Sequence, residues 1–236
     1  MSEVEKVLVF REAILWETIP GFDGILVGQP AQEAADKILQ PDNLFYRSRP
    51  QAEIDPSIKQ VIPYTVIRNK GRILSYQRTK KAGENRLHGK KSIGWGGHIN
   101  PCDGDGGIAY EKCFWRELGE ELSLERQSHE VLPPVTAVLY ESGTEVGRVH
   151  FGVVHILDVS DNFVWNPESD SSVDNVEWLD IQDLNVSIET YEAWSQMVIK
   201  DALAVPFERF HNLGMNSPDT PPLPDIDVET AVKKLP

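Results

Sequence analysis

The chain has 236 residues, of which 40% are hydrophobic, and its formal net charge is −14. This length suits one large domain or two small ones, and no apolar run is long enough to span a membrane. The acidic balance argues against nucleic-acid polymers as partners. Residues 1–6 lack the basic start of a secretory signal, so we expect a cytoplasmic protein whose two cysteines, Cys102 and Cys113, are free thiols rather than a disulfide.

The first part of the chain is expected to be an N-terminal extension, residues 1–56, packed on a following core. Residues 7–10 form a short β-like run, and residues 31–39 carry apolar side chains at helical spacing. Residues 45–50 end in proline and predict irregular structure.

The core is expected to open with a β-hairpin, because two β-like runs, residues 61–67 and 72–78, flank Asn69-Lys70-Gly71. Basic residues are concentrated from here to the next motif, and a basic segment would attract an anionic substrate to a neighbouring site. The alternative is a solvated hairpin that these charges keep soluble. The basic residues are Arg68, Lys70, Arg72, Arg78, Lys80, Lys81, Arg86, Lys90 and Lys91.

A glycine-rich turn at residues 94–100 is followed by a helix predicted over residues 108–122. Within that helix Glu117, Glu120 and Glu121 are spaced three and four residues apart, so their side chains are neighbours. Such close like charges repel unless a cation compensates them, and Mg²⁺ prefers oxygen ligands from carboxylates and substrate phosphates. The combination predicts a metal-dependent phosphate site, with Mn²⁺ as a possible substitute.

Beyond the acidic helix, residues 134–140, 147–159 and 176–179 read as further strands. Residues 191–203 predict a closing helix that turns Tyr191, Trp194 and Val198 toward the sheet. We expect the core to span residues 57–210, followed by a flexible, proline-rich tail over residues 211–236.

Residues 97–124 resemble a Nudix box, in which a glycine and a first glutamate precede the pattern Arg-Glu-apolar-x-Glu-Glu-x-Gly-apolar. Arg116, Glu117, Leu118, Glu120, Glu121 and Leu124 match the second half in register. Two departures are present: Ser123 replaces the second glycine, and a Gly-rich loop adds about five residues before the helix. The lead-in at residues 59–64 and the Gly-Gly-His-Ile-Asn run with its loop insertion look like a bacterial subgroup described only as predicted phosphoesterases. This resemblance covers most of residues 45–205.

The resemblance implies that Glu120 and Glu121 ligate the metal, together with the backbone carbonyl of Gly96. It leaves Glu117 as a further ligand or as the general base, with its carboxylate held by Arg116. Asp103 and Glu111 compete as partners of Arg116. Calcium binding at the Asp103 loop is rejected, because an EF-hand aligned on its glycine would begin at a proline and end at a lysine.

Other candidate residues lie outside the box. Arg78 ends a strand just before the glycine turn and is expected to bind substrate. Arg47 and Arg49 reach substrate phosphate or pair with Glu53 and Asp55. The resemblance makes Glu177 a candidate additional ligand or base, in competition with Glu168 and Asp170 or with a purely solvated acidic loop. His98 is expected to be structural rather than catalytic.

The sequence therefore predicts an α+β fold, a Nudix-like mixed β-sheet sandwiched between helices. The implied function is Mg²⁺-dependent hydrolysis of a phosphoanhydride in a phosphorylated small molecule of the nucleoside-diphosphate-linked type, and the extension offers a homodimer interface. A second reading is a non-catalytic module that senses a nucleotide, although such a module does not need all three glutamates. A third is an enzyme like isopentenyl-diphosphate isomerase, which needs a catalytic cysteine in an apolar pocket, whereas Cys102 lies beside the loop.

Overall fold

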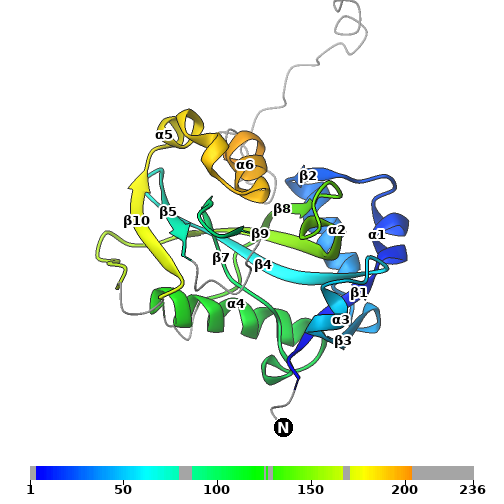
Figure 1. Cartoon of the computed structure of the whole chain (residues 1–236). Helices are drawn as coiled ribbons and strands as arrows, with labels where there is room; N and C mark the ends of the chain where they lie inside the picture. Colours follow the sequence, from blue (N-terminus) through cyan, green and yellow to red (C-terminus); the bar gives the residue numbers. More distant parts are fainter. Residues whose placement is uncertain (1–3, 80–86, 125, 127–129, 167–170, 204–236) are drawn as a thin grey trace, which may run out of the picture. The chain divides into compact units, whose positions relative to one another are not determined.

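The computed structural model describes residues 4–79, 87–124, 126, 130–166 and 171–203, and its centre is a mixed β-sheet (Figure 1). Hydrogen-bonded neighbours follow the order β10-β5-β4-β9-β8-β2. The long strands β4 and β9 pair in parallel, and their neighbours along this order pair antiparallel. The strand bounds are β2 (Gly24–Val27), β4 (Ile58–Asn69), β5 (Arg72–Arg78), β8 (Val135–Tyr140), β9 (His150–Asp158) and β10 (Val173–Leu179).

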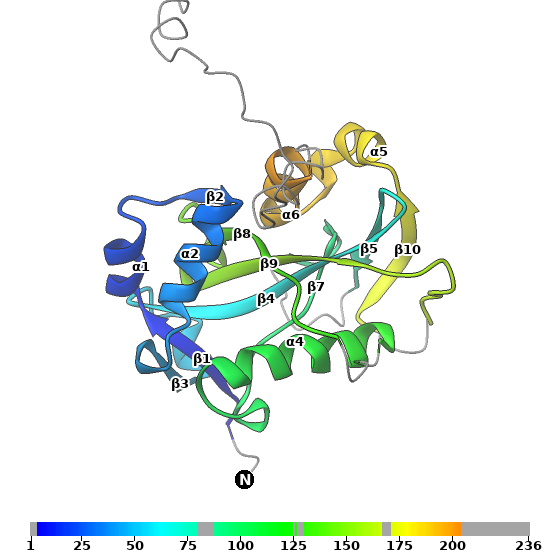
Figure 2. The same ribbon diagram turned by 180° about the vertical axis from the view of Figure 1, so that it is seen from behind.

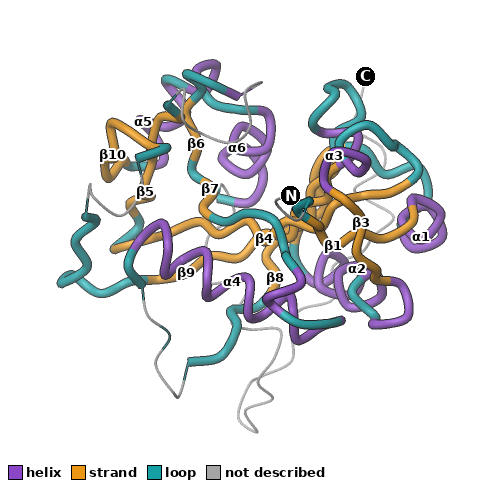
Figure 3. The backbone as a smooth tube through the Cα atoms, turned by 60° about the horizontal axis from the view of Figure 1, so that its bottom comes forward, coloured by secondary structure: helices purple, strands orange, loops and turns teal. Residues whose placement is uncertain are grey.

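Helices cover both faces of this sheet, which confirms the predicted fold class. Helix α4 (Gly106–Leu122) lies on one face, while α5 (Ile181–Val186), α6 (Ala193–Met197) and the adjoining π-helical turn (Val198–Ala202) lie on the other (Figures 1 and 2). Phe114, Leu118 and Leu122 of α4 are buried, as their four-residue spacing predicts. Figure 3 shows α4 running across β9 and β4.

The hairpin between β4 and β5 forms as predicted, with Asn69 paired to Arg72 around Lys70-Gly71. Two short strands follow: β6 (Lys91–Ser92) pairs with β5, and β7 (Gly94–Trp95) pairs with β4. They lead the chain into the glycine turn, which therefore starts at the sheet and ends at α4. Of the predicted basic residues, Lys80, Lys81 and Arg86 lie outside the described residues.

The N-terminal residues join the sheet rather than forming a separate body. Strand β1 (Lys6–Arg11) pairs antiparallel with both β3 (Leu44–Ser48) and β4, and helices α1 (Glu12–Thr18), α2 (Gln29–Ile38) and α3 (Arg49–Ala52) complete this part of the chain. The prediction of irregular structure over residues 45–50 is wrong. Residues 44–48 become a strand because β1 provides a pairing partner, and Pro50 lies in the first turn of α3, where a missing N–H costs nothing.

Further predictions concern the closing helix, the cysteines, a membrane span and the tail. The closing helix starts at Ala193 rather than residue 191, yet Tyr191 and Val198 are fully buried as expected. Both cysteines are free thiols, Cys102 exposed and Cys113 buried. Within the described ranges no helix has both the length and the apolar character needed to cross a bilayer. The tail predicted over residues 211–236 lies outside those ranges.

Candidate functional site

A cavity of about 830 Å³ opens where the glycine turn, α4, β9 and the segment before α6 meet. This volume is typical of a small-molecule site. Its wall combines acidic, basic and aromatic groups, including all three glutamates of the sequence motif. Lining residues that bear on function are Arg78, His98, Arg116, Glu117, Glu120, Glu121, His150 and Glu192.

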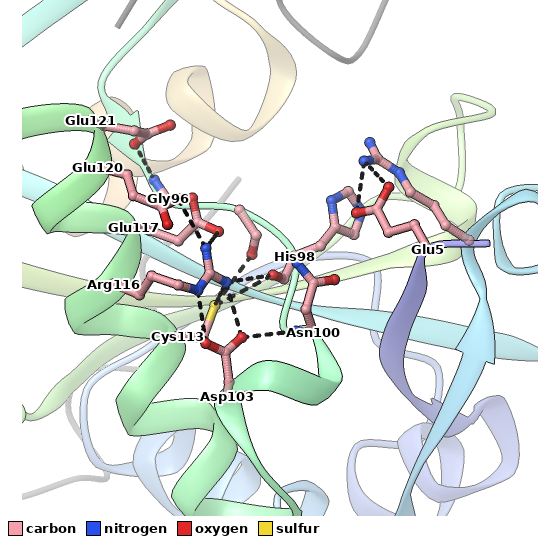
Figure 4. A network of polar contacts seen from close by, with 12 residues as sticks. Glu5, Gly96, His98, Asn100, Asp103, Cys113, Arg116, Glu117, Glu120 and Glu121 are labelled. Atoms are coloured by element: carbon pink, nitrogen blue, oxygen red, sulfur yellow. Dashed lines mark hydrogen bonds and ion pairs between the residues drawn. The ribbon is translucent and has the colours of Figure 1, made fainter. Parts of the chain in front are cut away.

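Arg116 holds the acidic groups of this wall together (Figure 4). Its guanidinium donates to both carboxylate oxygens of Asp103, at 2.8 Å from Nε and 2.9 Å from Nη2. Nη1 donates to Glu117 at 2.8 Å and to Glu120 at 3.1 Å, and Nη2 also donates to the carbonyl of His98 at 3.1 Å. Arg116 thus connects the helix to both the glycine turn and the loop before α4.

Of the two expected partners, Asp103 pairs with Arg116 at 2.8 Å and Glu111 does not. Glu111 instead pairs with Arg126 at 2.6 Å. Asp103 is buried and accepts the Asn100 N–H at 2.8 Å within the 3₁₀ turn Pro101–Asp103. Although burial opposes ionisation, the hydrogen bonds from Arg116 and Asn100 lower the pKa of the Asp103 carboxyl. Asp103 is therefore a charged support for Arg116.

The two glycines allow the turn to lie directly against the helix glutamates. Gly96 has a φ of +135°, and a Cβ there would lie 2.2 Å from the Pro63 carbonyl oxygen. Its N–H donates to Glu121 at 2.9 Å. At Gly97 an added Cβ would lie 2.8 Å from either Glu117 carboxylate oxygen. The positive φ and the Pro63 carbonyl require glycine at position 96, whereas a side chain at position 97 would displace the Glu117 carboxylate.

The three glutamates differ in their surroundings. The Glu117 side chain is 12% exposed, and the Glu120 side chain is 61% exposed. Burial raises the pKa of the Glu117 carboxyl, although Arg116 opposes that shift. Asp103, Glu117 and Glu120 all contact the Arg116 guanidinium, and three carboxylates against one guanidinium leave two formal negative charges, to which Glu121 adds a third. This all-oxygen, negatively charged set fits a hard divalent cation such as Mg²⁺.

Arg78 lines the same cavity from the end of β5 and pairs with Glu192, its Nε lying 3.5 Å from Oε2. Glu192 is buried and also accepts a hydrogen bond from Ser92 at 2.5 Å. Burial tends to lower the pKa of the guanidinium, but Tyr76, Glu192 and Glu121 raise it further above its usual value. Arg78 therefore presents a permanent positive charge to the cavity.

The other predicted residues are placed less centrally. Arg49 lines the cavity and pairs with Glu5 at 3.1 Å and Glu53 at 3.6 Å. Arg47 is exposed on β3 and is not among the lining residues. Glu177 is exposed on β10, away from the lining, where Lys91 pairs with it at 3.3 Å. Glu168 and Asp170, the alternative candidates for an additional ligand or base, lie outside the described residues.

The sequence does not predict Glu192 or His150 as cavity residues, and it gives Glu53 only as an ion-pair partner of Arg47 or Arg49, a pair that Arg49 forms. The sequence around Glu192 indicates its role only weakly: it is a single acidic residue in a segment whose neighbours Tyr191 and Ser195 are buried. The sequence around His150 and Glu53 does not indicate their role, because their proximity to His98 arises only in the folded chain. Burial, with contributions from Arg49 and His150, holds the pKa of the His98 ring well below its usual value.

Comparison with known proteins agrees with this geometry. The NUDIX domain family model matches residues 59–201, more than half of the chain. Protein YmaB of Bacillus subtilis (strain 168) is 30% identical over 155 residues, which cover 64% of this chain and 74% of YmaB. The crystal structure of Tm1382, provisionally assigned as a Nudix hydrolase, superposes with a TM-score of 0.68 at 27% identity and covers 84% of this chain and 98% of Tm1382. The shared fold therefore extends beyond the matched domain.

Proposed function

This chain belongs to the NUDIX domain family, and on that premise we propose that it is a Mg²⁺-dependent hydrolase. Its substrate would be a compound with a phosphoanhydride bond, of the nucleoside-diphosphate-linked or a related type. The relationship to Tm1382, which is provisionally assigned as a Nudix hydrolase, supports hydrolysis in general terms. The bond cleaved and the metal are inferred from the cavity.

One observation carries the proposal: the glycine turn lies directly against the acidic helix at the cavity wall. Gly96 donates its N–H to Glu121, and Gly97 has no side chain where Glu117 approaches. Glu120 and Glu121, with the Gly96 carbonyl, would hold Mg²⁺, or Mn²⁺ in its place. When bound, the cation supplies positive charge that stabilises the phosphate oxygens in the transition state.

The remaining side chains supply binding and proton transfer. Arg78 presents a positive charge that suits a substrate phosphate. The Glu117 side chain is much less exposed than that of Glu120, and its raised pKa suits a general base that accepts a proton from the attacking water. Arg116, fixed by Asp103, orients the Glu117 carboxylate through the 2.8 Å hydrogen bond.

The proposal is tested by a phosphate-release screen with Mg²⁺ on the wild type, Glu121→Gln and Glu111→Gln. The panel covers ADP-ribose, dinucleotides, sugar nucleotides and nucleoside triphosphates, with a coupled phosphatase to reveal monoester products. We expect kcat to fall by about a hundredfold or more in Glu121→Gln, since removing a group that stabilises developing charge typically costs on this order. Glu111→Gln is the matched control, because Glu111 lies on the same helix and pairs with Arg126.

The alternative is a nucleotide-sensing module that binds without hydrolysis. It predicts that the folded protein binds a panel compound and Mg²⁺ but releases no phosphate. Equal activity in Glu121→Gln and the wild type would contradict the metal assignment itself.

A further inference from the structure

We propose that Glu53, His98 and His150 bind a divalent transition metal of the zinc type, at a second position on the cavity wall. The three residues come from three separate parts of the fold. Glu53 follows α3 in the N-terminal segment, His98 lies in the glycine turn, and His150 begins β9. Their ligand atoms lie within 4.8 Å of one another, and both histidines line the cavity.

The distances fit a metal site with little adjustment. The two imidazole Nε2 atoms are 3.3 Å apart, and each lies 3.9 Å from Glu53 Oε1. Ligands about 2.0 Å from a tetrahedral zinc ion are separated by roughly 3.3 Å. The histidine pair already has that spacing, and the carboxylate needs to approach by about half an ångström.

His150 also has the hydrogen bond that usually supports a metal ligand. Its Nδ1 lies 2.7 Å from the Val146 carbonyl oxygen, so Nδ1 carries the proton and donates it. The Nε2 lone pair then faces His98 and Glu53. Metal-binding histidines characteristically donate the other ring N–H to a backbone carbonyl in this way.

The chemistry of this site differs from that of the helix glutamates. Two imidazoles and one carboxylate form a donor set seen in catalytic zinc sites, which keep a further position for water or substrate. Imidazole favours transition metals, whereas a set of oxygens favours Mg²⁺. Because both histidines line the cavity, a metal held by them would adjoin the substrate space and would accept water or a phosphate oxygen as a further ligand.

Nearby charges are compatible with a cation. Arg49 lies 3.6 Å from Glu53 but is also paired with Glu5, so this group carries two carboxylates against one guanidinium. His98 connects the Arg116 network to the proposed zinc site. Its backbone carbonyl accepts a hydrogen bond from Arg116, and its ring faces His150. Figure 4 shows His98 between the Arg116 network and Glu5.

The test measures metal binding, so its result does not depend on any hydrolytic activity. The full-length protein is stripped with a chelator and titrated with Zn²⁺ against a chromophoric competitor, in excess Mg²⁺. We expect one tightly bound equivalent. Glu53→Gln, His98→Gln and His150→Gln should each weaken binding by more than about tenfold, the loss that follows even when a residue supporting a ligand is removed.

Two matched variants complete the design. His155→Gln removes a different buried histidine, and Glu121→Gln removes a helix carboxylate; both should keep the bound Zn²⁺. Co²⁺ gives a second readout, because its visible spectrum reports a four-coordinate nitrogen and oxygen site. Circular dichroism checks that each variant is folded, and Glu53→Gln changes one charge at a partly exposed position. Absence of tight Zn²⁺ binding, or binding lost in Glu121→Gln but kept in the histidine variants, overturns the proposal.

Discussion

At the scale of single residues, Asp103 shows how one buried carboxylate fixes the site without lining it. Asp103→Asn keeps the shape but removes the charge that Arg116 contacts with two hydrogen bonds. Hydrogen bonds to charged groups contribute about 1.5–3 kcal/mol, so we expect the unfolding free energy to fall by about 2 kcal/mol. Urea denaturation measures this change. The freed guanidinium should also neutralise Glu117 and Glu120, and a titration should show weaker Mg²⁺ binding.

The matched control is Asp105→Asn, an exposed residue two positions away whose side chain makes no helix-cap hydrogen bond. Its stability should stay within about 0.5 kcal/mol of the wild type, as for most surface substitutions. If both variants lose the same stability, the support that Asp103 gives to Arg116 is not the cause.

His155 gives a second prediction at this scale, one about pH. It is fully buried, its Nδ1 donates to the Pro133 carbonyl at 2.7 Å, and its Nε2 accepts from the Tyr110 hydroxyl at 2.8 Å. Burial lowers the pKa of the ring to about 4. The unfolded chain therefore binds a proton near pH 6.5 that the folded chain does not take up until about pH 4.

Stability from this residue is complete above pH 6.5 and is lost as the pH falls toward 4, by up to about 3 kcal/mol. Glutamine can replace both hydrogen bonds and does not titrate. The difference in unfolding free energy between the wild type and His155→Gln should therefore change by about that amount between pH 7 and pH 4. Parallel stability curves for the two proteins would contradict the burial argument.

At the scale of elements, the turn between β7 and α4 depends on Gly96. An alanine there has an unfavourable φ and a Cβ in contact with the Pro63 carbonyl, so the turn must move away from β4. We expect Gly96→Ala to lower the unfolding free energy by about 2–4 kcal/mol. Thermal denaturation measures the effect. Gly107→Ala is the control, because an added Cβ meets nothing in the first turn of α4, and it should be neutral or stabilising by up to about 1 kcal/mol.

The elements also show what the sequence can and cannot predict. The hairpin, α2, α4 and β8 have strong local patterns, and they form close to where periodicity places them. Strand β3 has no such pattern, and its conformation depends on β1 as a partner. The same distinction holds in the site. The α4 residues are recognisable from helical spacing, whereas Glu192 and His150 reach the cavity through tertiary contacts that spacing does not encode.

At the scale of the whole molecule, the N-terminal segment is part of the core. Leu8, Phe10, Leu15 and Ile38 are fully buried in one cluster with residues of β4, α4 and β9. Burying a large apolar side chain contributes about 1.5–3 kcal/mol, so losing these four contacts would remove about 6–12 kcal/mol, as much as the net unfolding free energy of about 5–15 kcal/mol of a typical domain.

We therefore expect that deletion of residues 1–56 leaves a chain that does not fold cooperatively. Circular dichroism melts and limited proteolysis, with the full-length chain as reference, test this. A deletion variant with a sharp transition near the wild-type temperature would show that the two parts are separable. An ion pair at 2.9 Å between the buried Lys59 and the half-buried Glu12 also connects β4 to α1.

The contrast between the two cysteines makes this protein suitable for selective chemical labelling. Cys113 is buried under the glycine turn, its Sγ 3.5 Å from the His98 carbonyl oxygen, and burial raises the pKa of its thiol. Cys102 is exposed in the 3₁₀ turn that ends at Asp103. A maleimide dye should attach to Cys102 alone in the native protein and to both thiols after denaturation. A single fluorophore would then sit beside the Arg116 network, where its emission could follow a ligand entering the cavity without any engineered residue.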